Sequence, residues 1–141
     1  MTTEGGAIGA TVAAMRPDAV VSLTLVCASA HFGEAAPWQH RAALVREMGT
    51  SAVLDSSPAR WFADRATTAR TPLGSALLQD LAGADAHGYA ACCDALAQYD
   101  LRESLALISA PTLVIGGTED TATPSHHAEE LAAGVPEQDS H

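Results

Sequence analysis

The sequence predicts an α/β fold: a short parallel sheet with a helical segment inserted between its two strands. Two short apolar runs, at residues 20–27 and 112–115, carry this prediction. Both are rich in β-branched residues and are bounded by proline, glycine or polar residues, as expected of buried strands. A helical pattern precedes the first run and another follows the second, an alternation typical of parallel sheets.

The composition indicates a globular domain. The chain has 141 residues, of which 48% are hydrophobic and 17% charged, enough for a hydrophobic core. Its net charge of −10, with seven Lys and Arg, argues against a nucleic-acid partner. No apolar run is long enough to span a membrane, so we expect no membrane partner. Three cysteines without a disulfide framework predict a cytoplasmic protein.

Residues 5–15 predict a helix with an unusually bare face. Gly5, Gly9 and Ala13 recur at helical spacing, and three small residues on one face let a helix lie close against a sheet. An Arg-Pro-Asp sequence ends this helix, and the strand at residues 20–27 follows it. The chain therefore opens as helix–strand.

Residues 38–99 predict a set of helices without a strand, which we interpret as a lid. The core would then comprise residues 1–37 and 100–141. Cys92 and Cys93 are interpreted as small buried residues and not as nucleophiles, because no basic residue lies near them in the sequence. The apolar positions that define the helices are Trp38, Ala42, Val45 and Met48, then Trp61 and Phe62, then Leu73, Leu77, Leu78 and Leu81, and finally Tyr89, Cys92, Cys93 and Leu96.

Residues 108–124 hold the first candidate for chemistry. Two glycines end the strand at 112–115, Glu119 and Asp120 follow, and Pro124 opens a helical segment at 125–133. Open α/β sheets keep their functional groups on loops at the carboxyl ends of strands, which favours Asp120 as a functional carboxylate. The alternative is that Asp120 caps the helix that follows it.

Four stretches carry a family resemblance: L-V-C-A-S-A-H-F-G at 25–33, R-W-F at 60–62, H-G-Y-A-A-C-C-D-A-L at 87–96, and residues 100–124. Together with the element order, they resemble the second half of an α/β-hydrolase. Within that superfamily they are similar to the 3-oxoadipate enol-lactonases of aromatic catabolism. The resemblance implies hydrolysis of a small anionic enol-lactone by a Ser–His–Asp triad, with neither metal nor cofactor.

The resemblance also assigns residues to roles. Asp120 falls on the triad acid, and Thr3 falls on the serine of the G-x-S-x-G nucleophile motif. The backbone N–H of Glu4 would then be one oxyanion donor. A β-branched residue is poorly suited to the strained nucleophile turn, so the alternative is that Thr3 is an ordinary residue near a helix start. We expect the first part of the motif and the triad histidine to be missing from this sequence.

Two further residues are candidates for substrate binding. His31 lies on the loop after the first strand, where a contact with a substrate carboxylate is set against an ordinary loop histidine. Trp38 matches the lid tryptophan of the family, as a pocket wall or as a core anchor of the first lid helix. His126 and His127 are predicted to lie on the surface of the last helix. The histidines and cysteines lack the paired spacing of a metal site.

The sequence therefore predicts an α/β-hydrolase relative with lactonase ancestry and little or no activity by itself. The alternatives are a non-catalytic binding or assembly module, or another α/β-hydrolase esterase. We expect two parallel strands with a helix on each side. We also expect exposed sheet edges that favour self-association or a covering partner. Asp120 is predicted to be partly solvated and dispensable for stability.

Overall fold

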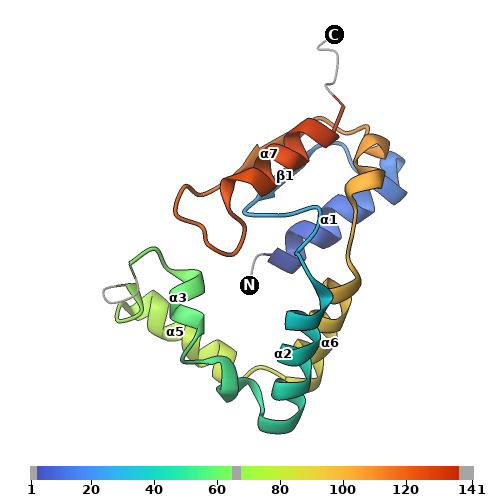
Figure 1. The fold of residues 1–141 in the computed structure, drawn as a ribbon. Helices are drawn as coiled ribbons and strands as arrows, with labels where there is room; N and C mark the ends of the chain where they lie inside the picture. Colours follow the sequence, from blue (N-terminus) through green and yellow to red (C-terminus); the bar gives the residue numbers. More distant parts are fainter. Residues whose placement is uncertain (1–2, 65–67, 137–141) are drawn as a thin grey trace. The chain divides into compact units, whose positions relative to one another are not determined.

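The chain divides into two compact units in a computed structural model, which describes residues 3–64 and 68–136. One unit combines Met1–Phe32 with Tyr99–His141, and the other is Gly33–Gln98 (Figure 1). The first unit contains α1 (Thr3–Met15), η1 (Pro17–Ala19), β1 (Leu23–Val26), η3 (Arg102–Leu107), β2 (Thr112–Ile115) and α7 (Ser125–Gly134). The second contains α2 (Ala35–Met48), η2 (Thr50–Val53), α3 (Ser57–Trp61), α5 (Pro72–Ala82) and α6 (Ala86–Gln98).

The two strands pair in parallel, with Leu25 of β1 opposite Val114 of β2. This confirms the predicted parallel pair and the bounds of the second strand. The first strand is shorter than predicted, because η1 occupies residues 17–19 and the four residues of β2 offer partners only from Leu23 onwards. The Leu23 N–H donates a hydrogen bond to the carbonyl of Pro111, the residue before β2, and the Cys27 N–H donates to the carbonyl of Ile115 at the end of β2. These two bonds close the ladder at its ends.

Within residues 3–64 and 68–136, the sheet is covered on one face only. Leu25 is buried and Val114 packs against the same core cluster, whereas Val26, Leu113 and Ile115 point to the other face and are 48%, 58% and 45% exposed. The predictions of fully buried strands and of a helix on each side are therefore wrong. Alternate residues of a strand point to opposite faces of the sheet. Both α1 and α7 contribute to the cluster on the covered face. The cluster comprises Ala10, Ala13, Ala14, Leu25, Ala28, Ala30, Leu101, Leu105, Ile108, Leu131 and Val135.

Of the two glycines on the predicted bare face, Gly9 lies against the sheet, with Leu23 Cδ1 3.7 Å from a hypothetical Cβ, but the tightest approach is made by Gly6 and not by Gly5. A Cβ atom on Gly6 would lie 2.6 Å from the Cβ of Ala28, so this position has no room for a side chain. Gly5 has nothing within 4 Å of the same hypothetical atom, and Gly5 is exposed. Ala13 is fully buried, as the predicted face requires. The periodicity identified a bare face but not which of two adjacent glycines faces the sheet.

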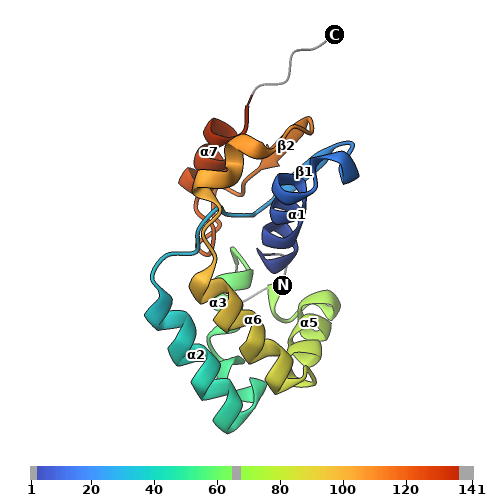
Figure 2. The same ribbon diagram turned by 90° about the vertical axis from the view of Figure 1, so that its right-hand side faces the viewer.

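In the helical unit, α2 and α6 lie side by side (Figures 1 and 2). Ala42 of α2 and Ala90 and Cys93 of α6 are buried where the helices meet, and Trp38 and Tyr89 pack on this cluster partly buried. The small alanine side chains allow the two helices to approach closely. A second cluster of Val45, Val53 and Leu81 joins α2, η2 and α5.

Several apolar positions of the predicted lid helices lie outside these clusters. Cys92 is exposed, so the prediction that it is buried is wrong. Met48, Leu73 and Leu77 of the predicted apolar stripes are exposed as well. Helical spacing selects a face, but a residue is buried only where a neighbouring element covers that face. None of the helices in the described ranges is both long enough and apolar enough to cross a membrane.

Candidate functional site

Two loops meet at the carboxyl edge of the sheet. The Ser29 loop, residues 27–32, leaves β1, and the acid loop, residues 116–124, leaves β2 (Figure 1). Because the strands are parallel, both loops leave from the same edge, the usual position of a functional site in an open α/β sheet. Asp120 lies in the acid loop, as the sequence predicts.

Asp120 closes the acid loop with its own side chain. Its Oδ1 accepts hydrogen bonds from the N–H groups of Ala122 at 2.8 Å and Thr123 at 2.9 Å. Its Oδ2 accepts a hydrogen bond from the Thr123 hydroxyl at 2.7 Å. The residue before α7 is Pro124, and no side chain caps the helix. The alternative prediction that Asp120 caps this helix is therefore wrong, since its bonds lie within the loop.

The site electrostatics keep Asp120 ionised. Burial opposes its ionisation, but hydrogen bonds from Thr123, Ala122 and Cys27 outweigh that cost and hold the pKa of Asp120 below its usual value. Burial first, and the Asp120 carboxylate second, raise the pKa of the Cys27 thiol. Cys27 therefore remains a protonated donor to Asp120 and lacks the thiolate that a nucleophile requires.

Cys27 also has an uncommon backbone conformation. Its φ is +48°, and it is the one non-glycine residue with positive φ in the part of the chain described by the structure. This conformation is uncommon for a residue with a Cβ atom. It turns the chain sharply at the end of β1 and brings the Cys27 thiol to the carboxylate of Asp120.

Ser29 and His127 form a contact that the sequence prediction missed. The Nδ1 atom of His127, in the first turn of α7, lies 2.5 Å from the Oγ atom of Ser29. His127 is half-buried, so the prediction of a surface position is wrong for it, whereas His126 is exposed as predicted. A serine flanked by Ala28 and Ala30 in the loop that follows β1 was the available signal, because small neighbours allow a polar side chain to be buried.

The Ser29–His127 contact does not make Ser29 a nucleophile. Ser29 is only 1% exposed, and its Oγ also lies 2.6 Å from the carbonyl oxygen of His31. A nucleophile must reach the substrate, and in a Ser–His–Asp triad the serine contacts Nε2 of the histidine and not Nδ1. The contact is therefore structural.

The backbone of His31 forms an antiparallel bridge with Asp100. The Asp100 carboxylate pairs with the Arg102 guanidinium, with an Nε to Oδ1 distance of 2.8 Å. Hydrogen bonds from Arg102, with a smaller contribution from His31, hold the pKa of Asp100 well below its usual range. The His31 ring thus lies near a carboxylate that already has a guanidinium partner.

Thr3 and Glu4 lie in the first turn of α1, consistent with the predicted helix start. The side chain of Thr3 is outside the described residues. Gly6 lies against Ala28 of the Ser29 loop, so α1 begins at the same edge of the sheet as the acid loop. The N–H groups of a first helical turn have no partner within their helix, as an oxyanion donor requires.

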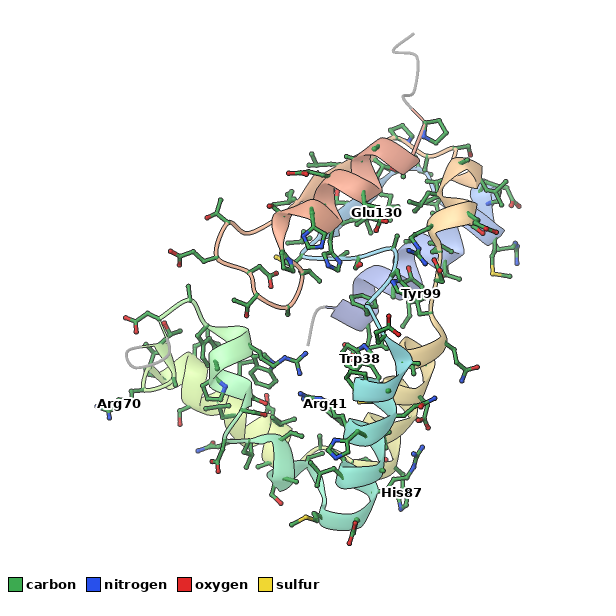
Figure 3. All side chains as sticks on the ribbon, in the orientation of Figure 1. Trp38, Arg41, Arg70, His87, Tyr99 and Glu130 are labelled. Carbon is green, nitrogen blue, oxygen red and sulfur yellow. The ribbon has the colours of Figure 1, made fainter. Side chains whose placement is uncertain are left out.

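Trp38 lies in the helical unit with two guanidinium groups on neighbouring residues. The Cζ atom of Arg60 is 5.8 Å from the centroid of the Trp38 ring, and Arg41 Nη1 donates to the Tyr89 hydroxyl at 3.3 Å. Figure 3 shows Trp38 and Arg41 on α2. Trp38 also packs on the cluster around Ala42, so it anchors α2 against α6. Among the described residues, no group of three or more His, Cys, Asp or Glu is placed to hold a metal ion.

The parallel strand pair, its two helices and a carboxylate after β2 define part of an α/β-hydrolase fold. Solved structures support this class directly. A hydrolase from Pseudomonas aeruginosa PA01 matches 94% of this chain with a TM-score of 0.88 and 34% identity. The enol-lactonase from Burkholderia xenovorans LB400 matches 94% with a TM-score of 0.86 and 33% identity. The match covers 51% of each of those chains.

Curated relatives specify the family further. 3-Oxoadipate enol-lactonase 2 of Acinetobacter baylyi is 39% identical over 119 residues, which are 84% of this chain and 45% of the relative. 3-Oxoadipate enol-lactonase 1 of the same organism is 38% identical over 102 residues, or 72% and 38%. The chain is a homologue of the 3-oxoadipate enol-lactonases, which confirms the resemblance found in its residues. It spans less than half the length of these two curated relatives. No family model matches it.

Proposed function

We propose that this chain contributes the acid residue and the helical lid of an enol-lactone hydrolase, with Asp120 as the triad acid. One observation carries the proposal: Asp120 is a half-buried, ionised carboxylate at the carboxyl edge of a parallel strand pair, in a loop shaped by its own hydrogen bonds. The names of its relatives suggest the substrate class, a small anionic lactone.

The proposed role of Asp120 is to hold a histidine. In Ser–His–Asp hydrolysis the acid accepts the Nδ1–H of the histidine, fixes its tautomer and stabilises the imidazolium. A carboxylate has about four acceptor positions, and the N–H groups of Ala122 and Thr123, the Thr123 hydroxyl and the Cys27 thiol can fill all four, so a histidine would replace the weakest of these donors, the Cys27 thiol. In the described part of the chain, no histidine hydrogen-bonds to it. We therefore expect the chain by itself to show little or no turnover.

Thr3 takes the nucleophile position in this proposal, and the Glu4 N–H takes that of an oxyanion donor. A hydroxyl without a base to accept its proton is a weak nucleophile at neutral pH, and one oxyanion donor stabilises less than two. Both points support the expectation of weak activity. Lactone hydrolysis by the chain that disappears in Thr3→Ala would instead make Thr3 a working nucleophile.

Positive charge in the helical unit supports recognition of an anionic substrate. Arg60 lies over Trp38 and Arg41 bonds to Tyr89, so two guanidinium groups flank an aromatic surface. A guanidinium binds a carboxylate in a bidentate manner, and an aromatic ring provides an apolar wall. We propose Trp38 as a substrate-binding residue on this basis. His31 is proposed separately, from its position on the Ser29 loop at the carboxyl edge of the sheet.

A chimera tests the proposed function. This chain would replace the matched region of 3-oxoadipate enol-lactonase 2 from Acinetobacter baylyi, and hydrolysis of 3-oxoadipate enol-lactone would be measured. We expect activity that falls by about three to four orders of magnitude in kcat with Asp120→Asn. The matched control is Glu119→Gln, an exposed neighbour in the same loop, which should leave kcat unchanged. A folded chimera without activity, or one indifferent to Asp120→Asn, would contradict the proposal.

The uncovered sheet face favours a second candidate, a non-catalytic binding or assembly module. Val26, Leu113 and Ile115 form an exposed apolar surface that self-association or a partner would cover. Hydrolysis of another ester by the chimera would instead favour a different esterase.

We also infer a cytoplasmic location, because Cys27, Cys92 and Cys93 form no disulfide.

A further inference from the structure

The hydroxyl of Ser29 lies at the centre of a small buried hydrogen-bond network. Its Oγ is 2.6 Å from the carbonyl oxygen of His31, 3.0 Å from the His31 backbone nitrogen and 2.5 Å from Nδ1 of His127. Ser29 is 1% exposed, so water does not compete for these positions. The network joins the Ser29 loop to the first turn of α7.

The protons of this network can be assigned by counting donors and acceptors. A hydroxyl has one proton to donate and two lone pairs to accept with. The His31 carbonyl can only accept, so the Ser29 proton is directed to it, and the His31 N–H can only donate to Oγ. His127 Nδ1 must then donate to the remaining lone pair. Neutral His127 is therefore in the Nδ1–H tautomer, with its Nε2 unprotonated.

The same contact fixes one end of the acid loop. The loop begins where Cys27 N–H bonds to the Ile115 carbonyl at 2.8 Å, and it ends at Pro124, whose carbonyl accepts from the His127 N–H at 2.9 Å. The His127 ring then ties this end to Ser29. Asp120 lies between the two fixed ends.

We propose that Ser29 and His127 are a positioning pair that holds the acid loop, and with it Asp120, against the Ser29 loop through the Nδ1–H tautomer of His127. The consequence for catalysis rests on the proposed function, because the position of Asp120 affects hydrolysis only if Asp120 is the triad acid. The pair itself can be tested without any activity.

The groups around His127 favour its neutral form. Burial lowers the pKa of His127, and the neighbouring His126, whose ring centroid is 4.4 Å away, lowers it further. Glu130 on α7 and Asp120 on the acid loop oppose this, and His31 on the Ser29 loop adds to it. The tautomer is therefore a defined and measurable property at neutral pH.

The first test is the nitrogen NMR spectrum of the His127 imidazole in the full, isotopically labelled chain. We expect a protonated, pyrrole-type Nδ1 and an unprotonated Nε2. Ser29→Ala removes the acceptor and should return His127 to an exchanging mixture rich in Nε2–H, whereas Ser29→Thr keeps a hydroxyl and should restore Nδ1–H. An Nε2–H tautomer in the parent chain would overturn the assignment.

The second test measures the acid loop itself. Ser29→Ala should accelerate amide hydrogen exchange of Ala122 and Thr123 by about tenfold and move the titration midpoint of the Asp120 carboxyl toward its ordinary value. The matched control is Ser57→Ala, which removes another buried hydroxyl, one that donates to the Val53 carbonyl at 2.7 Å in the helical unit. Equal effects of the two substitutions, or none from Ser29→Ala, would overturn the proposal.

A second pair of variants covers the case in which Ser29→Ala fails to fold. His127→Asn places an amide N–H where Nδ1–H lies. His127→Leu introduces a side chain of nearly the same shape as asparagine but without a hydrogen-bond donor. We expect His127→Asn to retain the exchange protection of Thr123 and His127→Leu to lose about tenfold of it. Equal protection in both variants would show that the hydrogen bond does not hold the loop. None of these measurements depends on lactone hydrolysis, so their failure and that of the proposed function are distinguishable.

Discussion

The Thr123 hydroxyl donates a hydrogen bond to Asp120 Oδ2 at 2.7 Å, and the Thr123 side chain that makes this bond is buried. This bond and the two backbone N–H bonds to Asp120 Oδ1 hold residues 120–123 of the acid loop together. Asp120, which we propose as the triad acid, thus also shapes the loop that carries it. This dual role leads to predictions that separate stability from chemistry.

Asp120 should contribute moderately to stability, in contrast to the expectation from sequence that it is dispensable. Asp120→Ala removes the acceptor of the hydrogen bonds from Ala122, Thr123 and Cys27 in a half-buried loop and should lower the free energy of unfolding by about 1–2 kcal/mol. Asp120→Asn keeps an acceptor for the backbone bonds and should cost about half as much. Urea unfolding measures both, with Glu119→Ala as the neutral control. Equal losses for Asn and Ala would contradict this account.

The contribution of Asp120 should depend on pH in the acid range. Its pKa is lowered in the folded chain, so its stabilising effect is fully present above the unfolded pKa of about 4 and is lost as the pH falls through the folded pKa. The stability difference between the parent chain and Asp120→Asn should therefore shrink on acidification. Unfolding curves of both proteins from pH 6 downwards test this prediction. The other carboxyl groups titrate in both proteins, so their contributions cancel in the difference. A difference that grows on acidification would refute it.

Two adjacent glycines of α1 should respond in opposite directions to the same substitution. Gly6→Ala places a methyl group 2.6 Å from the Ala28 Cβ and should destabilise the chain by about 1–3 kcal/mol. Gly5→Ala meets no atom within 4 Å and should stabilise the helix by about 0.5–1 kcal/mol. Thermal unfolding of both variants provides the comparison. Stabilisation by both would show that α1 does not pack closely at Ala28.

Tyr99 should ionise late in alkaline solution. Burial, and to a lesser extent the charge of Asp100, raise the pKa of Tyr99 to about 12, and its ring packs beside Phe32 with centroids 5.6 Å apart (Figure 3 labels Tyr99). Because the folded pKa is raised, the associated stability is present below the unfolded pKa of about 10 and is lost as the pH rises toward 12. Phenolate absorbance in a Tyr89→Phe background reports Tyr99 alone. Full ionisation at pH 10 in the folded chain would contradict its burial.

The uncovered sheet face should drive self-association. Leu113→Thr keeps strand propensity while removing an apolar side chain from that face, and it should shift sedimentation toward the monomer. The control is Leu107→Thr, which alters a leucine of similar exposure, 61%, on η3. A monomeric parent chain at high micromolar concentration, or an equal effect of both substitutions, would argue against this face as the contact.

Local sequence patterns were sufficient to predict several elements because their causes lie within a few residues. Proline before residues 112–115 and two glycines after them define β2, and the position of Asp120 at its carboxyl end follows from that strand. The parallel pairing followed from the helix–strand and strand–helix order. Residue matches to the lactonases then placed the chain in its superfamily, and the relatives confirm this.

Contacts between distant segments were beyond such patterns. Helical spacing placed Met48 and Leu73 on apolar stripes, but both are exposed, because spacing alone does not show which positions a neighbouring element covers. The sequence predicts a surface position for His127, because the local pattern of the last helix carries no information about Ser29, which lies 98 positions away.

The sequence by itself therefore determined the class of fold, the lactonase relationship and the candidate acid, because short-range periodicity, turn residues and a motif specify these. Only the tertiary structure decided which glycine faces the sheet, which sheet face is covered and which tautomer His127 adopts. The physical reason is that burial and proton position depend on atoms that the chain brings together from distant positions. The position of Asp120 depends on both kinds of information. Its place after β2 follows from the local sequence, whereas the contact of His127 with Ser29, which fixes the end of its loop, joins distant positions.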